Sequence, residues 1–247
     1  MIPRLAIPAL SFRDTAGALD TATTAAYAQR AADTWLSMFI LSGTTTEGAT
    51  FSVRERTAVL EIWRSVTSTD RLLACCWEPS DVVAAIARGI RPLMVMRDLT
   101  DTAQALALFA WLPGEAYVYS HPAHTPTVLD ASLLTAAGEA GCLPAGAKIS
   151  KIPAGALPGL RAAAGPGFDL WDGSARAIGG SLRDGASGVV ATPLTAVPDP
   201  FPAPDADLQT GVDAWQADLD AVPDTAARAA WLRAAALSAG APPPRCR

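Results

Sequence analysis

The sequence predicts an α/β protein in which eight parallel strands, each followed by a helix, close into a barrel. Eight short apolar runs alternate with helix-like stretches between residues 4 and 194. Most of these runs are apolar throughout, as is typical of parallel strands covered on both faces. No glycine-rich phosphate-binding fingerprint follows the first run, which disfavours a doubly wound sheet. We therefore predict a (β/α)8 TIM barrel.

The predicted strands share short length, continuous apolar character and flanking turn residues. They span residues 4–10, 35–43, 72–77, 92–97, 116–120, 147–153, 168–173 and 188–194.

The segments between the strands have helix start and stop signals. Residues 52–66 open on Ser52, a residue type favoured at the N-cap, and carry apolar residues at helical spacing. Residues 79–89 begin with Pro79 and end with Gly89, the usual asymmetry of a helix. The same pattern predicts helices within residues 100–114 and 127–141.

A change of composition near residue 195 divides the chain. The stretch that follows is rich in proline, and residues 224–240 then read as a helix. We predict a barrel over residues 1–195 and a short C-terminal helical extension over residues 196–247, packed on the barrel as part of a single domain.

Composition and charge narrow the class of protein. Half of the residues are apolar and 17% are charged, with a net charge of −5 and a pI near 5.0. This composition is that of an ordinary soluble protein, and its charge argues against nucleic acid or an anionic membrane as the main partner. No apolar run approaches the roughly 20 residues of a membrane span, and none at the N-terminus resembles a signal peptide. We expect a cytoplasmic location.

Cysteine and histidine are too sparse to predict a metal site. The chain has four cysteines, Cys75, Cys76, Cys142 and Cys246, without the spacing of a metal site or a disulfide framework. The adjacent Cys75 and Cys76 are expected to be buried free thiols in a strand. His121 and His124 are the only histidines, and no carboxylates stand at ligand spacing beside them. We predict neither a metal nor a cofactor.

Functional groups of this fold lie at the C-terminal ends of the strands. The segment "GTTTEG" at residues 43–48 follows the second strand and could offer hydroxyls and backbone N–H groups to a carboxylate, or merely cap the next helix. The fifth predicted strand ends at Tyr119, whose phenol could donate or accept a proton. Tyr117 and Tyr119 alternate in phase with the strand, so both could instead be packing residues.

The only two lysines, Lys148 and Lys151, stand in the sixth predicted strand of a chain that has 17 arginines. Their odd spacing on a strand predicts side chains on opposite faces. A lysine surrounded by apolar walls has a lowered pKa and can form a Schiff base, which arginine cannot do because it is never deprotonated. The alternatives are a lysine that reaches solvent at a strand end, or two codons that escaped a compositional bias.

Taken together, these three segments make the chain resemble the dihydrodipicolinate synthase and N-acetylneuraminate lyase family of class I Schiff-base aldolases. The resemblance extends over about residues 4 to 195. The family's GTTGE motif is similar to "GTTTE" at 43–47, and its Y-N-x-P pattern to "YSHP" at 119–122. Its lysine pattern, K-x-x-x-G-x-L, is similar to "KIPAGAL" at 151–157 and thereby selects Lys151 rather than Lys148. "WDG" at 171–173 and "GVVAT" at 188–192 resemble its last two strands.

The resemblance implies a role for each matching residue. Lys151 would form the imine with a 2-oxo acid, usually pyruvate, and Tyr119 would shuttle the proton. Thr44 would contact Tyr119 and bind the substrate carboxylate. The remaining substrate-binding positions would be Gly43, Thr45, Gly173, Val190 and His124, and no cofactor would be needed.

Four departures separate the chain from the family pattern. Thr46 stands in place of a glycine, and Gly48 in place of a common serine. No relay tyrosine follows the fourth strand, and His124 stands where true synthases have an arginine. We predict a Schiff-base lyase or aldolase acting on pyruvate or a related small 2-oxo acid, as a homodimer or homotetramer. The alternatives are a catalytically degenerate barrel that binds a carboxylate or has a structural role, and a sugar-acid dehydratase using the same imine chemistry.

Overall fold

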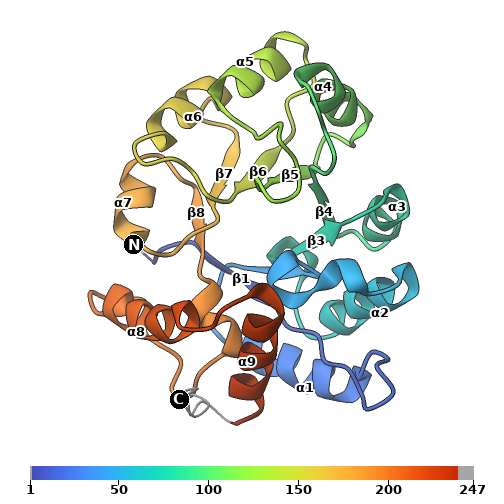
Figure 1. The fold of residues 1–247 in the computed structure, drawn as a ribbon, viewed down its shortest axis with the longest axis vertical. Coiled ribbons are helices and arrows are strands. Elements are labelled where there is room, and N and C mark those ends of the chain that lie inside the picture. Colours follow the sequence, from blue (N-terminus) through green and yellow to red (C-terminus); the bar gives the residue numbers. More distant parts are fainter. Residues whose placement is uncertain (1, 239–247) are drawn as a thin grey trace.

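The computed structural model describes residues 2–238. Its eight strands are all parallel and close into one barrel in the order β1 to β8, with β1 pairing β8. Helices surround the barrel (Figure 1). The predicted (β/α)8 TIM barrel is therefore confirmed, as are the C-terminal helices that follow it.

The strands are short and lie where apolar runs were found. They are β1 (Leu5–Ala9), β2 (Met38–Leu41), β3 (Leu72–Cys76), β4 (Arg91–Val95), β5 (Tyr117–Ser120), β6 (Gly146–Ile149), β7 (Asp169–Asp172) and β8 (Gly188–Val190). As expected, Cys75 and Cys76 are buried free thiols in β3. Cys246 lies outside the described residues.

The ends of two predicted helices carry the expected residues. Ser52 caps α2 in a capping box with Glu55, and Gly89 follows α3 with a φ of 65°. The helices are α1 (Thr21–Ala32), α2 (Val53–Arg64), α3 (Pro79–Ile86), α4 (Thr102–Trp111), α5 (Ala131–Glu139), α6 (Leu157–Ala164), α7 (Ile178–Arg183), α8 (Leu208–Asp220) and α9 (Thr225–Leu237). Short 3-10 helices form η1 (Thr44–Thr46), η2 (Gly48–Thr50), η3 (Thr69–Arg71) and η4 (Thr192–Ala196).

All the strands except β5 end earlier than predicted, and the difference is largest for β6 and β8. β6 stops at Ile149, and Lys151, expected on the strand, has a φ of 60°, which no strand accommodates. β8 stops at Val190, because Pro193 cannot donate to a strand ladder and the chain enters η4 instead. The error in β6 matters most, because the strand's end decides where each lysine can lie.

Side chains alternate between two apolar layers along each strand. One cluster fills the barrel and the other lies between strands and helices. The inner cluster consists of Ala6, Met38, Ile40, Leu73, Cys75, Trp77, Leu93, Val95, Tyr117, Tyr119, Trp171 and Val190. In β6, Ala147 and Ile149 belong to the outer cluster, so the residue between them faces the barrel interior.

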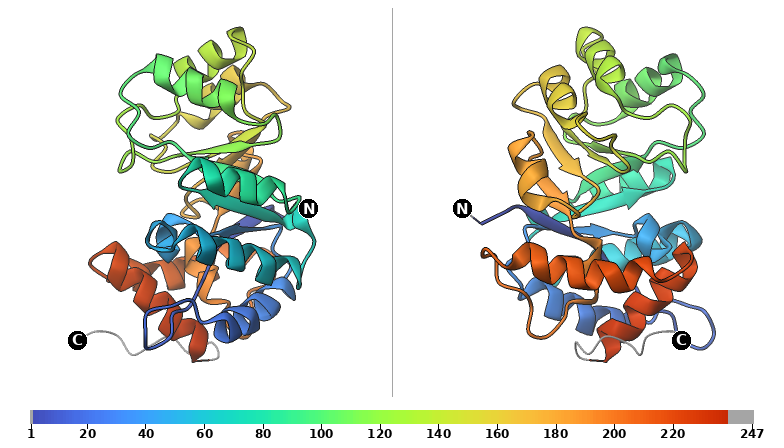
Figure 2. Two further views of the ribbon diagram at one scale, coloured as in Figure 1. Left: turned by 90° about the vertical axis from the view of Figure 1, so that its right-hand side faces the viewer. Right: turned by 60° about the vertical axis from the view of Figure 1, so that its left-hand side comes forward.

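The two C-terminal helices pack against the sector that contains α1 and β1 (Figures 1 and 2). Arg30 of α1 donates to the carbonyl of Ala236 in α9 over 2.7 Å, and Tyr27 donates to the carbonyl of Thr195 over the same distance. The predicted boundary between residues 195 and 196 stays a prediction, and residues 239–247 of the extension lie outside the described residues. Within residues 2–238, no helix is both long and apolar enough to cross a membrane.

Candidate active site

The turn after β2 folds around one carbonyl. The Gly43 oxygen accepts the N–H groups of Thr46 and Gly48 over 3.3 and 2.9 Å, and the Thr46 hydroxyl over 3.2 Å. The left-handed residue is Glu47, with a φ of 58°, so Thr46 occupies its position without needing glycine's freedom. A Cβ on Gly48 would lie 1.7 Å from the Ser42 oxygen, so glycine is required there. The two departures in the motif are thus compatible with a tight turn.

This turn leaves hydrogen-bond donors available. As the first residues of η1, Thr44 and Thr45 have no turn of helix before them to accept their N–H groups. Within residues 2–238 neither N–H group has a protein acceptor. Both side chains are partly exposed. Adjacent free N–H groups with hydroxyls form a suitable cradle for a carboxylate.

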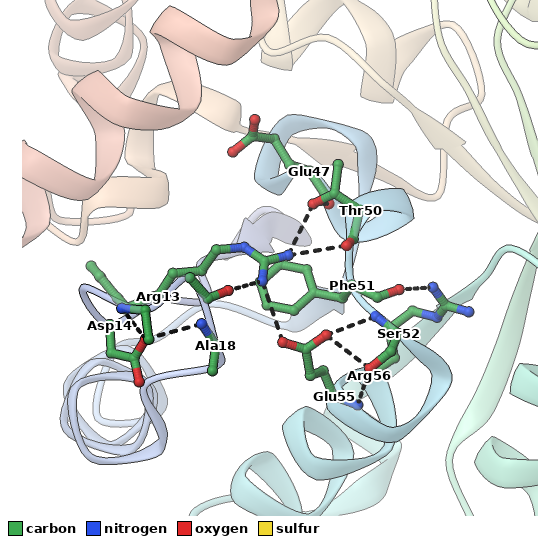
Figure 3. Close-up of polar contacts among 12 residues, drawn as sticks. Arg13, Asp14, Ala18, Glu47, Thr50, Phe51, Ser52, Glu55 and Arg56 are labelled. Carbon is green, nitrogen blue, oxygen red and sulfur yellow. Dashed lines mark hydrogen bonds and ion pairs between the residues drawn. The ribbon is translucent and has the colours of Figure 1, made fainter.

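Arg13, on the loop after β1, holds the segment that leads from this turn into α2 (Figure 3). Its guanidinium donates to the Thr50 carbonyl and hydroxyl, both over 3.1 Å, and pairs with Glu55 over 3.3 Å. It also lies 3.9 Å from the centre of the Phe51 ring. The loops after β1 and β2 are thereby tied together.

A buried ion pair joins α2 to the first turn of α3. Arg56 contacts Asp81 over 2.8 Å, and both side chains are only 6% exposed. Asp81 also accepts the N–H of Trp77 over 2.8 Å, and the Trp77 indole donates to the Ser42 carbonyl over 2.8 Å. Trp77 is therefore fixed by hydrogen bonds on both sides before it reaches the site.

Three predicted residues meet above the inner cluster. The Thr44 hydroxyl lies 3.5 Å from the Tyr119 hydroxyl and 3.1 Å from Nε2 of His124. The His124 ring packs edge-on against Tyr119 and Trp77, with ring centres 6.0 and 5.5 Å apart. The contact between Thr44 and Tyr119 is long for a hydrogen bond, as is common in unliganded catalytic sites.

The lysine that joins this group is Lys148. It pairs in register with Tyr119 on one side and Trp171 on the other, and both of these side chains lie in the inner cluster. Its amine lies 4.0 Å from the centre of the Tyr119 ring, and the residue is 6% exposed. Lys151 is exposed on the loop beyond the strand. The structure therefore brings Thr44, Tyr119 and His124 together with Lys148 and leaves Lys151 outside.

The surroundings of the Lys148 amine are apolar and hold no fixed counter-charge. Within residues 2–238, no carboxylate forms an ion pair with it. Burial raises the pKa of the nearby Cys75 thiol to about 12, although the Lys148 charge acts in the opposite direction. Cys75 is therefore protonated at neutral pH and does not compete as a nucleophile.

His121, to which no role was assigned from the sequence, also borders the site. Its ring centre lies 5.3 Å from that of His124 and 6.1 Å from that of Tyr119. Its Nδ1 accepts the N–H of Ala123 over 2.9 Å, so the neutral ring carries its hydrogen on Nε2. Burial, together with His124, Lys148 and Lys151, lowers the pKa of His121 to about 4. Burial and Lys148 also lower the pKa of His124, while Asp98 acts to raise it.

The low pKa of His121 predicts a loss of stability in acid. Between about pH 6.5, where an unfolded histidine titrates, and pH 4, the unfolded chain binds a proton that the folded chain does not. The free energy of unfolding must therefore fall as the pH drops through this window. In His121→Asn the fall should be smaller, because asparagine can still accept the Ala123 N–H but does not titrate. Urea denaturation at several pH values measures both, and equal slopes would contradict the expectation.

The other predicted binding residues lie close to the site through their backbones or the inner cluster. Gly173 donates to the Ile149 carbonyl over 2.8 Å, and a Cβ there would lie 2.5 Å from Oγ of Ser150. Gly173 thus allows the end of β7 to approach the end of β6. Val190 belongs to the inner cluster, and Gly43 anchors the turn through its carbonyl rather than through any lack of space.

A hollow of about 570 Å³ opens at the opposite end of the barrel. Residues that begin the strands line it, including Arg4, Arg91, Tyr117 and Asp169. Asp169 already accepts from Arg4 over 2.8 Å and from the Tyr117 hydroxyl over 2.5 Å. Its size does not make it the active site, because chemistry in this fold occurs at the C-terminal ends of the strands. In the described part of the chain, no group of three His, Cys, Asp or Glu residues could hold a metal.

Comparison with known proteins finds similarity at the level of structure only. No family model and no curated protein matches the sequence. A 2-keto-3-deoxygluconate aldolase variant from Sulfolobus solfataricus is similar over 98% of this chain and 89% of its own, with a TM-score of 0.78 and 16% identity. A dihydrodipicolinate synthase from Cyanidioschyzon merolae is similar over 99% of this chain and 92% of its own, with a TM-score of 0.74 and 18% identity.

A further structure, of a Coccidioides immitis protein assigned to the dihydrodipicolinate synthase family, is similar over 95% of this chain and 84% of its own, with a TM-score of 0.74 and 20% identity. At such identities the likeness establishes the fold, over nearly the whole chain. The structural neighbours therefore include both dihydrodipicolinate synthase family proteins and 2-keto-3-deoxygluconate aldolases.

Proposed function

We propose that this chain is a divergent Schiff-base lyase of the dihydrodipicolinate synthase and N-acetylneuraminate lyase family, with Lys148 rather than Lys151 as the imine-forming residue. The observation that carries the proposal is the position of the Lys148 amine, buried in the barrel 4.0 Å from the centre of the Tyr119 ring. A nucleophilic amine, a phenol beside it and a hydroxyl next to the phenol are the groups that imine formation requires.

The reaction begins at the carbonyl of a 2-oxo acid. The Lys148 amine attacks C2, and the carbonyl oxygen takes up a proton to give a carbinolamine. Tyr119 donates a proton to the departing hydroxyl, which leaves as water, and the nitrogen keeps its bond to C2 as an iminium. Tyr119, left as a phenolate, then takes a proton from C3, and the iminium accepts the electron pair of the broken C–H bond to give an enamine. The enamine carbon then forms a bond to an aldehyde, or in reverse the C3–C4 bond breaks.

Thr44 and Thr45 bind the carboxylate of the substrate. Two observations support this role: their N–H groups have no protein acceptor within residues 2–238, and Thr44 contacts Tyr119. A carboxylate bound in this cradle would hold C2 of the substrate near both the amine and the phenol. The attack of the amine on C2 then becomes effectively unimolecular. His124, neutral above its lowered pKa, offers a hydrogen bond rather than a full charge to the rest of the substrate.

The choice of pyruvate or a related 2-oxo acid is supported by the structural neighbours. One structure of the Sulfolobus aldolase contains pyruvate and another contains D-KDPG. The aldehyde partner and the direction of the reaction are left open. We retain the cytoplasm as the proposed location and a homodimer or homotetramer as the proposed assembly.

The alternative is a catalytically degenerate barrel. Such a barrel would have either a pocket blocked by Thr46 or a solvent-exposed Lys151 amine. Lys151 is exposed. The exposure of Lys151 does not argue against imine chemistry, because a second lysine, Lys148, is buried beside Tyr119. The Thr46 side chain is fully buried with its hydroxyl bonded to the Gly43 carbonyl, so it is turned away from the cradle. Neither observation favours the degenerate reading.

Reductive trapping tests the proposal. The full-length protein is incubated with pyruvate and borohydride, and separately with a panel of other 2-oxo acids and keto-deoxy sugar acids. Digestion and mass spectrometry then locate any adduct. We expect a reduced adduct on Lys148 with at least one 2-oxo acid. Release of water without C–C cleavage from a sugar acid would instead identify the dehydratase. No adduct with any compound would overturn the Schiff-base proposal.

A further inference from the structure

One arginine of the C-terminal extension contacts the turn after β2, next to the carboxylate cradle of Thr44 and Thr45. Arg233, on α9, donates through Nη1 to the Glu47 carboxylate over 2.7 Å and through Nη2 to the Thr46 carbonyl over 3.2 Å. Its Nε donates to the Ser11 carbonyl, after β1, over 3.0 Å. All three nitrogens of a single guanidinium thus bind two different loops at the catalytic end of the barrel.

The helix that carries Arg233 is itself firmly docked. Leu232 and Ala235 are fully buried, and Arg30 of α1 holds the Ala236 carbonyl. Asp224 caps the first turn of α9 by accepting the N–H of Ala227 over 2.8 Å. The guanidinium is therefore presented from a fixed support, which is what allows one side chain to set the position of another element.

Arg233 binds the part of the turn that Arg13 does not reach. Glu47 has a φ of 58°, in the left-handed region that is unfavourable for a residue with a Cβ. In Figure 3 its carboxylate is turned away from the Arg13 cluster, and it is Arg233 that pairs with it. Arg13 holds the segment only from Thr50 onward. Arg233 thus binds the two residues, Thr46 and Glu47, that directly follow Thr44 and Thr45.

We infer that Arg233 is a positioning residue for the substrate-binding turn, and that the C-terminal extension is a working part of the active site. This inference rests on the proposed function, in which Thr44 and Thr45 bind the substrate carboxylate. The ion pair alone is partly exposed and contributes little. The two carbonyl contacts give the guanidinium its directional effect, because a planar fork aligns several acceptors at once.

Trapping as a function of pyruvate concentration tests the inference. In Arg233→Met the half-saturating pyruvate concentration should rise about tenfold while the trapping rate at saturation changes little, because the cradle is misdirected and the amine is untouched. Arg233→Lys should recover only a small part of the loss, since an ammonium can reach Glu47 but cannot also bind both carbonyls. Arg30→Met is the matched control, because it loosens α9 without touching the turn.

The outcomes separate the two proposals. Half-saturation raised in Arg233→Met and unchanged in Arg30→Met supports the inference. Equal half-saturation in Arg233→Met and the wild type overturns it while leaving the Schiff-base function intact. An equal rise in both variants also overturns it, because general docking of α9 would then be responsible. A wild-type protein that forms no adduct overturns the proposed function and this inference with it.

Discussion

Lys148→Met is expected to abolish the borohydride-trapped adduct with pyruvate and to lower turnover on the order of 10⁴- to 10⁶-fold, the size of loss seen when a catalytic nucleophile is removed. The interior of the barrel around Lys148 is apolar, and methionine has a similar length and no charge to bury. The variant should therefore fold, so that loss of the adduct reports chemistry. Mass spectrometry of the trapped protein and circular dichroism measure the two properties.

The neighbouring lysine provides the control. Lys151→Met removes the exposed amine three residues away and should keep both the adduct and most of the turnover, because this side chain lies beyond the end of β6. An adduct that persists in Lys148→Met and disappears in Lys151→Met would refute the assignment and restore the one predicted from the sequence motif.

Tyr119→Phe is expected to lower turnover by about 10²- to 10⁴-fold, the usual contribution of a positioned acid or base. The aromatic ring and its contact with the Lys148 amine remain, while the hydroxyl beside Thr44 is lost. Imine formation should therefore slow without a large change in the pyruvate concentration needed for half-saturation. Time courses of borohydride trapping at several pyruvate concentrations measure both the rate of imine formation and the pyruvate concentration at half-saturation.

Tyr117→Phe is the matched variant on the same strand and the same face. Its hydroxyl donates to Asp169 at the opposite end of the barrel, over 2.5 Å. We expect it to lower the free energy of unfolding by about 1–3 kcal/mol, because Asp169 loses a partner, and to leave turnover nearly unchanged. A comparable loss of turnover in both variants would show that Tyr119 acts through packing rather than through its phenol.

The barrel could be predicted from sequence because its strands are continuous apolar runs in regular alternation with helices. Helix caps followed from local residue types, as at Ser52 and Gly89. The end of β6 did not follow in this way. Residues 147–153 are mostly apolar and read as one strand, whereas the left-handed backbone at Lys151 is a property of the folded loop.

The positions of the two lysines relative to the barrel could not be predicted from the sequence for the same reason. Spacing within "KIPAGAL" favoured Lys151, but the face of the barrel that each lysine reaches depends on where the strand begins and ends. A signal for Lys148 was present: on a strand ending at Ile149, it alternates with two apolar residues that face the helices. The contact of Arg233 with Glu47 spans 186 positions in the sequence and had no local signal at all.

The scarcity of lysine, together with the contrast between its two positions, makes the protein unusually easy to observe by spectroscopy. Incorporation of isotope-labelled lysine alone would give a spectrum with two side-chain signals, one from the barrel interior and one from the exposed loop. The loop signal serves as an internal reference in the same tube. The proposed reaction at Lys148 could then be followed directly in the intact protein, without any substitution.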